Sequence, residues 1–292
     1  MRKENRFLGI FLCCVTAVFA QVKGKVVDEN KQPIPYVNIW VEGENVSTTS
    51  DVDGHFVLHI TSEKALLFSS LGFEKKKVMS TDVSLVQLLP TTYELGEILV
   101  LNKKETKKIE IGQPENSIHQ AFENGPKFDA KYFPYKPNYK KTQYIKKVSV
   151  FTENALEEAS IKIHFYTVNA DGLPGEELLK KDFVVSVKKG ARRTWFDLTS
   201  LNVVFPKEGL FVAIERLFID KNKFEKTVAT NDPNKTKLQR TYFPLPFYSF
   251  VEGSYTYTFL GGKWTKETKK DGDGNIIKTR IFEPAIRLLL TN

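Results

Sequence analysis

Two histidines, His55 and His59, have the spacing of a metal-binding pair. On a helix, residues four positions apart lie on one face, so both rings could reach one metal ion. The flanking residues alternate between apolar and polar, with Phe56, Leu58 and Ile60 on one side, which predicts a strand. On a strand the two Cα atoms are ~13 Å apart, so we expect no metal site here.

A second candidate is the segment Asp271-Gly272-Asp273-Gly274-Asn275, whose oxygen ligands alternate as in a calcium loop. An EF-hand needs glycine at its sixth position and glutamate at its twelfth, where this chain has Ile276 and Phe282. The flanking segments are strand-like, so a turn is favoured. A calcium site of another kind stays open.

The sequence contains no motif that indicates a particular enzymatic reaction. Nucleophile elbows, P-loops and dinucleotide fingerprints are absent, and we expect neither a cofactor nor an enzyme. The paired acids Glu157-Glu158 and Glu176-Glu177 are sequence neighbours, which point to opposite faces of a strand. One alternative remains, in which the protein is a hydrolase that uses carboxylates from distant strands. His164 is expected on the exposed side of a strand.

Aromatic residues beside prolines give the one positive indication of a ligand site. They lie in segments 132–135 and 242–248, where exposed rings can stack on a sugar face or hold a peptide. In the alternative, the rings close the ends of a β-sandwich. The candidate ligand-binding residues are Tyr135, Tyr242, Phe247 and Tyr248.

The first twenty residues have the pattern of a secretory signal peptide. Arg2, Lys3 and Arg6 precede the apolar run Phe7–Phe19, and Ala20 ends a cleavage site. The run is too short for a membrane span. Lipid attachment at Cys13 or Cys14 is the other alternative, although neither cysteine follows a small residue. We expect an exported protein, in the periplasm, outer-membrane associated or at the cell surface.

The remaining chain has no cysteine, which excludes disulfides, thiolate nucleophiles and cysteine-based zinc sites. The 292 residues carry 43 Lys+Arg, 35 Asp+Glu and 41% hydrophobic residues. This composition is typical of a folded protein. The positive charge is dispersed along an exported chain, so we expect no nucleic-acid partner. No other apolar stretch is long enough for a transmembrane span.

Residues 21–101 form a series of short predicted strands separated by turns. Three motifs, Gly24-x-Val26-x-Asp28, Asp53-Gly54-x-Phe56 and Leu67–Phe73, lead to the exit segment Leu95–Val100. In this order they resemble the carboxypeptidase regulatory-like domain of exported Gram-negative bacterial proteins. The resemblance implies a transthyretin-like β-sandwich with no active site. It covers this N-terminal part only, and the peptidase module that can accompany such a domain is missing.

Residues 102–141 read as a linker, because a lysine run at 103–108 is followed by prolines at 126, 134 and 137. The lysines suit a solvated linker. The alternative is a patch that binds a membrane surface or an acidic glycan.

From residue 142 to 292 the β pattern returns with longer strands. Segments 144–152 and 159–167 alternate, and the nearly continuous apolar run Leu210–Ile219 predicts a central strand covered on both faces. The chain is thus predicted to be all-β, with the N-terminal transthyretin-like β-sandwich followed by a larger jelly-roll-like β-sandwich.

Taken together, these features predict a non-enzymatic accessory protein of the cell envelope that binds a glycan or a protein partner through loops of the C-terminal sandwich. The first alternative is a structural or assembly protein that acts through protein–protein contacts. The second alternative is the carboxylate-dependent hydrolase.

Overall fold

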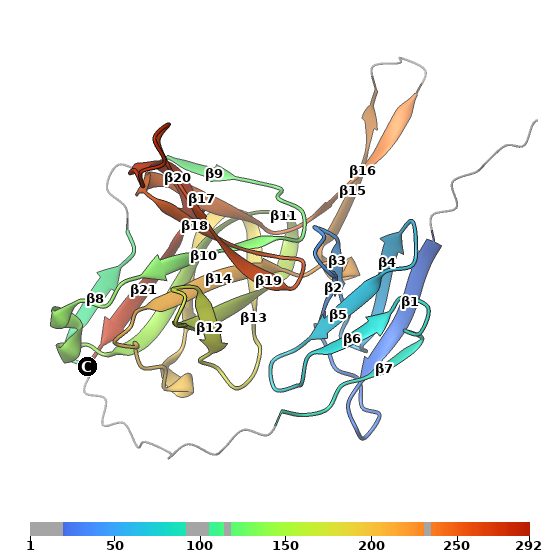
Figure 1. Ribbon diagram of the computed structural model, residues 1–292, viewed down its shortest axis with the longest axis horizontal. Coiled ribbons are helices and arrows are strands. Elements are labelled where there is room, and N and C mark those ends of the chain that lie inside the picture. The colour runs from blue at the N-terminus through green and yellow to red at the C-terminus, as the bar shows by residue number, and fades with distance from the viewer. Residues whose placement is uncertain (1–19, 92–104, 114–117, 231–234) are drawn as a thin grey trace, which may run out of the picture.

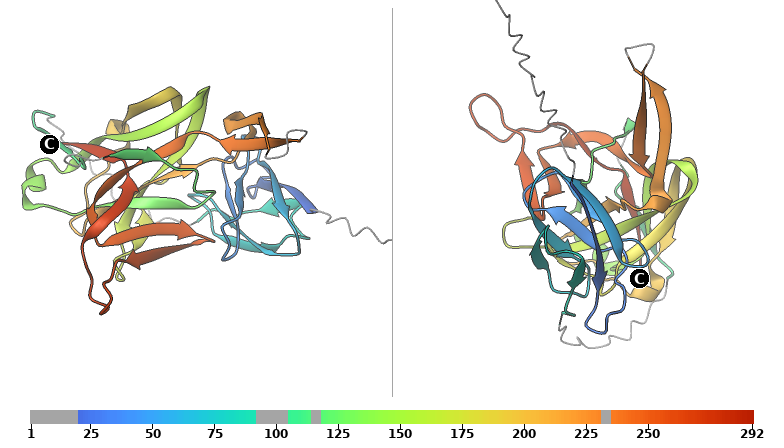
Figure 2. Two further views of the ribbon diagram at one scale, coloured as in Figure 1. Left: turned by 90° about the horizontal axis from the view of Figure 1, so that it is seen from above. Right: turned by 90° about the vertical axis from the view of Figure 1, so that its right-hand side faces the viewer.

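A computed structural model describes residues 20–91, 105–113, 118–230 and 235–292. The described chain is built almost entirely from β-strands, which form two units side by side (Figures 1 and 2). The all-β prediction is confirmed. The predicted leader, at residues 1–20, lies outside the described residues apart from Ala20. No helix in the described ranges is long and apolar enough to cross a membrane.

The first unit is a two-sheet sandwich, as predicted. One sheet has the order β4-β1-β7 and the other the order β3-β2-β5-β6. The strands are β1 (Ala20–Val27), β2 (Asn38–Val41), β3 (Ser47–Thr49), β4 (His55–Ile60), β5 (Ala65–Ser69), β6 (Lys76–Met79) and β7 (Leu85–Gln87).

The core of this sandwich follows the alternation in its strands. In β4 the side chains of Phe56, Leu58 and Ile60 are buried and those between them are exposed. Phe56 meets Phe68 edge to face across the two sheets, with ring centroids 5.6 Å apart. Alternating residues of a strand point to opposite faces, so the sequence pattern alone specifies which side packs inward.

A large curved sheet dominates the second unit. Its main path is β19-β18-β10-β14-β11-β17-β20, and β12, β13 and β21 also pair with β11. Its longer strands are β10 (Phe128–Phe133), β11 (Tyr144–Val168), β13 (Phe183–Asp197), β14 (Leu210–Arg216), β17 (Leu245–Gly253), β18 (Tyr255–Leu260), β19 (Lys263–Thr268), β20 (Thr279–Pro284) and β21 (Ile286–Thr291). The short ones are β8 (Lys108–Ile111), β9 (His119–Ala121) and β12 (Pro174–Glu177), and three 3-10 turns lie at Pro137–Lys141, Thr199–Leu201 and Asp220–Asn222.

Strand β11 is the long strand that runs through the whole second unit and pairs with different strands along its length. Two separate strands were expected at 144–152 and 159–167, but they form one 25-residue strand. Its pairing with β13 shifts register between Asn154 and Glu158, where the strand passes an irregularity. The first half pairs with β21 and the second half with β14. All seven residues of β14 are buried, which confirms the predicted central strand.

The predicted linker at 102–141 contains strands of the large sheet in the parts that the structure describes, 105–113 and 118–141. Strand β10 lies inside the large sheet between β14 and β18, and β8 pairs with β21. The prolines at 126 and 134 flank β10 rather than interrupt it. Proline is tolerated just outside a strand, so its presence on both sides concealed a strand of only six residues.

The Asp271–Asn275 segment forms the favoured turn. Oδ1 of Asp271 accepts hydrogen bonds from the backbone N–H groups of Asp273 and Asn275, at 3.0 Å and 2.8 Å. Lys270 and Ile276 form an isolated bridge across it. The strands β19 and β20 that flank the turn pair with other strands and not with each other.

Strand β2 connects the two units because it is buried on both faces. Ile39 and Val41 belong to the core of the first sandwich. Trp40, on the opposite face and 1% exposed, joins a cluster with Phe128 and Phe211 of the second unit. Its ring meets Phe259 edge to face at 5.6 Å. The units therefore share an apolar interface.

Candidate functional site

A cleft of about 780 Å³ lies beside this interface and is lined by both units. The first unit contributes Asn38 of β2 and the loop at 69–73 after β5. The second unit contributes side chains of β11, β12, β14 and the β18–β19 hairpin. The volume falls in the usual range for a site that holds a small molecule.

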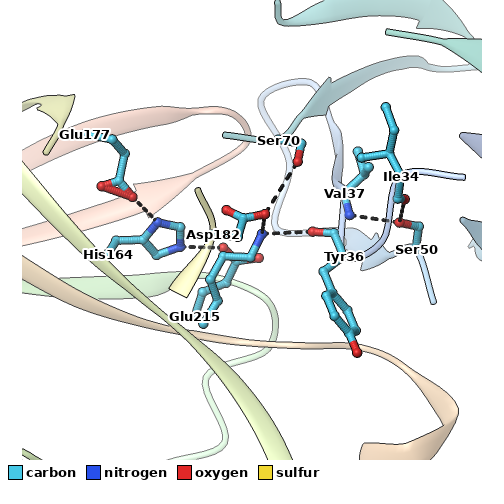
Figure 3. Close-up of polar contacts among 10 residues, drawn as sticks. Ile34, Tyr36, Val37, Ser50, Ser70, His164, Glu177, Asp182 and Glu215 are labelled. Carbon is cyan, nitrogen blue, oxygen red and sulfur yellow. Dashed lines mark hydrogen bonds and ion pairs between the residues drawn. The ribbon is translucent and has the colours of Figure 1, made fainter. Parts of the chain in front are cut away.

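His164 lies at the floor of the cleft, between two carboxylates (Figure 3). Its Nδ1 is 2.5 Å from Oε1 of Glu177, and its Nε2 is 2.7 Å from Oε2 of Glu215. The other oxygen of Glu177 accepts the backbone N–H of Phe165 at 3.1 Å. These contacts connect three strands, because His164 belongs to β11, Glu177 to β12 and Glu215 to β14.

The two carboxylates keep His164 protonated. Burial by itself would lower the pKa of this imidazole, but the charges and hydrogen bonds of Glu177 and Glu215 raise it to about 9. For Glu215, burial is opposed by the charge of Lys162 and the hydrogen bond with His164, and its pKa is lowered. The group is therefore an imidazolium at neutral pH, held between Glu177 and the ionised carboxylate of Glu215.

Two aromatic rings stack nearly parallel to this imidazolium. Phe128 lies 5.6 Å from the His164 ring at an interplanar angle of 7°, and Tyr166 lies 5.5 Å away at 12°. Trp264 meets Tyr166 edge to face at 5.4 Å and continues the aromatic wall toward Phe259. A cation beside aromatic faces is electrostatically favourable.

Lys162 ties this network to the first unit. Its side chain is 2% exposed, and its Nζ lies 3.0 Å from Oδ2 of Asp182. The same ammonium donates a 2.8 Å hydrogen bond to the carbonyl of Tyr36, and the Ser70 hydroxyl donates to Asp182 at 3.4 Å (Figure 3). Charges of Glu215 and Asp182 overcome the burial of Lys162, and its pKa is raised.

The carbonyl that receives Lys162 is itself held in place. Ser50 is fully buried, accepts the backbone N–H of Val37 at 2.8 Å and donates to the carbonyl of Ile34 at 3.0 Å (Figure 3). These bonds close the turn that contains Tyr36. Hydrogen bonds thus fix the turn that receives the Lys162 ammonium.

Some polar groups in the cleft have no partner. The Asn38 side chain is 8% exposed and lines the cleft, yet its amide makes no hydrogen bond with any residue that the structure describes. Within the same described ranges, the Tyr166 hydroxyl and the second carboxylate oxygen of Glu215 also make none. None of these atoms is among the fully buried unpartnered ones, so they are open to solvent and available to a ligand.

The four predicted ligand-binding residues do not line this cleft and do not lie together. Tyr135 packs against Tyr139 and Phe205 at the edge of the second core. Phe247 stacks on Phe151 at 4.2 Å. The role of Tyr135, Tyr242, Phe247 and Tyr248 in ligand binding stays a prediction.

Tyr248 and Tyr242 differ in whether a ligand could reach their side chains. Tyr248 is 5% exposed, and its hydroxyl donates to Oδ2 of Asp129 at 2.9 Å, so it is a buried strand residue rather than a loop residue. Tyr242 lines a smaller cleft of about 310 Å³ on the other side of the interface. His55 and His59 line that same cleft from the outer face of β4. No three metal-ligating side chains within the described part of the chain group around one point.

The expectation that His164 is exposed is wrong. The polar face of β11 does point away from the core of its own unit, but the first unit, the β12 segment and aromatic rings cover it. One signal could have found the network. Glu215 interrupts the otherwise apolar run of a central strand, and a buried carboxylate requires a partner.

Comparison with known proteins concerns the first unit. Residues 22–100 match the family model of the carboxypeptidase regulatory-like domain. This agrees with the resemblance inferred from the motifs, and the matched domain points to a non-catalytic role for this part of the chain.

The curated relatives are much longer proteins. The chain is 32% identical over 120 residues to the TonB-dependent receptor P3 of Formosa agariphila, a match over 39% of this chain and 12% of the receptor. It is 26% identical over 117 residues to the TonB-dependent receptor SusC of Bacteroides thetaiotaomicron, over 37% of this chain and 12% of that receptor. The matched stretch is thus about one eighth of each receptor.

Proposed function

We propose that this protein is an exported, non-catalytic binding protein of the cell envelope, and that the cleft between its two units is the binding site for a glycan or a protein partner. The single observation that carries this is the cleft itself, which joins an aromatic wall to unpartnered polar groups. The predicted leader and the similarity of the chain to TonB-dependent receptors support an envelope location.

The chemistry of the carboxylates favours binding over hydrolysis. A glycosidase needs a protonated acid whose pKa is raised, with a second carboxylate across the scissile bond. Here the pKa of Glu215 is lowered, and the ring of His164 fills the space between Glu177 and Glu215. The two acids converge on a histidine instead of on a substrate bond.

Association with envelope preparations from the native host tests this proposal. Trp264→Ala removes the aromatic wall of the cleft, and Trp195→Ala is the control, since Trp195 is 37% exposed and lies outside the cleft. We expect the first variant to lose association while the control retains it, with both variants still showing the β circular dichroism spectrum and the cooperative thermal unfolding of a folded chain. Equal association of the two variants would overturn the assignment of the cleft.

A structural or assembly role is the second candidate, and the hairpin of β15 (Lys223–Ala229) and β16 (Thr236–Tyr242) favours it. This hairpin forms a separate two-stranded sheet that projects from the second unit (Figures 1 and 2). Most of its side chains are exposed. Protease treatment of the envelope preparation, combined with Trp264→Ala, distinguishes the candidates. Association that is lost after proteolysis, survives periodate oxidation of sugars and is unchanged in Trp264→Ala supports the protein-contact role.

A further inference from the structure

We propose that the ligand of the cleft is an uncharged oligosaccharide, which stacks on the wall of Trp264 and hydrogen-bonds to Asn38, Tyr166 and Glu215. This inference rests on the proposed function and specifies the class of ligand for the same site. Three independent properties of the cleft lead to it.

The first property is the combination of an aromatic wall with a polar floor. Trp264, Phe259 and Tyr166 present rings, while Asn38 and Glu215 present an amide and a carboxylate. A sugar ring has an apolar face of C–H groups and an edge of hydroxyls, so it meets both surfaces at once. An apolar ligand would leave the polar floor unsatisfied, at a cost for each buried group.

The second property is the mixture of hydrogen-bonding groups that have no partner among the residues that the structure describes. The Asn38 amide both donates and accepts, the Tyr166 hydroxyl does the same, and the free oxygen of Glu215 only accepts. Sugar hydroxyls donate and accept, so they can satisfy all three groups. A ligand that only donates or only accepts cannot.

The third property is the balance of charge around the cleft. The cleft is lined by four cations and four anions. The cations are Lys75, Lys162, His164 and Lys263, and the anions are Glu176, Glu177, Asp182 and Glu215. Lys162 and His164 are already neutralised by direct ion pairs with Asp182, Glu177 and Glu215. Neither sign is in excess, so a charged ligand would gain no net attraction to offset its own desolvation.

Isothermal titration of the full chain with hexasaccharides of three charge classes tests the inference. The neutral probes are maltohexaose, cellohexaose and xylohexaose, the anionic probe is hexagalacturonate, and the cationic probe is the chitosan hexamer. We expect at least one neutral probe to bind and both charged probes to fail. Stronger binding of a charged probe overturns the inference, and so does the absence of any binding.

Failure here is distinguishable from failure of the proposed function. If no hexasaccharide binds but the envelope association still depends on Trp264, the cleft is a binding site for another class of ligand. If the association is independent of Trp264 as well, the proposed function fails.

Variants then locate the sugar in the cleft. Asn38→Ala and Trp264→Ala are each expected to weaken the neutral probe by about tenfold or more, and Tyr166→Phe, which keeps the ring, by a few-fold. Trp195→Ala is expected to bind like the parent. An unchanged affinity in both Asn38→Ala and Tyr166→Phe would contradict the assigned hydrogen bonds even if Trp264→Ala were to fold poorly.

Discussion

The Nζ atom of Lys162 lies 2.8 Å from the carbonyl oxygen of Tyr36, although the two residues are 126 positions apart in the chain. This hydrogen bond joins the two β units at a point where Lys162 is also paired with Asp182. A buried ammonium thus serves as a connection between domains. Removal of one partner of a buried ion pair leaves an uncompensated charge, which is the costly case.

Lys162→Met is therefore expected to lower the free energy of unfolding by about 3–5 kcal/mol, because Asp182 and the buried Glu215 lose their cation. Denaturant unfolding measures the change. The control is Lys189→Met, whose pair with Glu157 is exposed, with an expected change below ~1 kcal/mol. Similar effects of the two substitutions would contradict a role for the buried pair.

The stability of the protein is expected to fall at alkaline pH because of His164. The pKa of this histidine is raised from 6.5 to about 9 in the folded state, so its contribution is complete below pH 6.5 and is lost as the pH rises through 9. The contribution is on the order of 3 kcal/mol. Unfolding measured from pH 6 to pH 10 for the parent and for His164→Gln isolates it, since only the parent carries this titration. Parallel pH profiles would show that His164 is not held as an imidazolium.

Trp40→Ala is expected to uncouple the two units. The side chain is buried between the first sandwich and the Phe259 face of the second unit, and loss of a buried tryptophan costs about 3–5 kcal/mol. Scanning calorimetry should then show two transitions where the parent shows one. Trp195→Ala should keep the single transition, and a single unchanged transition for Trp40→Ala would show that the units are coupled elsewhere.

Gly54→Ala is expected to destabilise the first sandwich. Gly54 has φ of +77°, and an added Cβ would lie 2.4 Å from the carbonyl oxygen of Val26. The strain is expected to cost roughly 1–3 kcal/mol in thermal unfolding. Gly272→Ala provides the comparison, because an added Cβ there meets nothing within 4 Å. Equal melting temperatures for the two variants would be inconsistent with the described turn.

Much of the secondary structure was predictable from local patterns. The alternation in β4 and the apolar run of β14 specify strands and their buried faces directly. The motifs around Gly24 and Gly54 also led to the domain that the family model matches at residues 22–100. These features depend on neighbours within a few residues, which a single sequence displays.

The site was not predictable in the same way. The alternation along β11 correctly placed Lys162 and His164 on the face away from the core of their own unit. It could not show that the first unit and β12 cover that face. Burial by a segment more than a hundred residues away leaves no periodic pattern in the local sequence. The polar residues of the buried network were therefore predicted to lie on a solvated surface. The short strand β10 between prolines was missed for a related reason, because its partners β14 and β18 follow far along the chain.

The pairing of β11 also constrains the order in which the chain can fold. Tyr144 at the start of β11 pairs with Thr291, and Thr291 in turn pairs with Lys108. Contacts between segments so far apart require closure of long loops before they give any stabilisation, which slows folding. Until residues 286–291 have joined the sheet, one edge of β11 and the carbonyls of β8 have no partner there. A chain cut before this strand should collapse into a state with open β edges, prone to aggregation, rather than into a smaller version of the same fold.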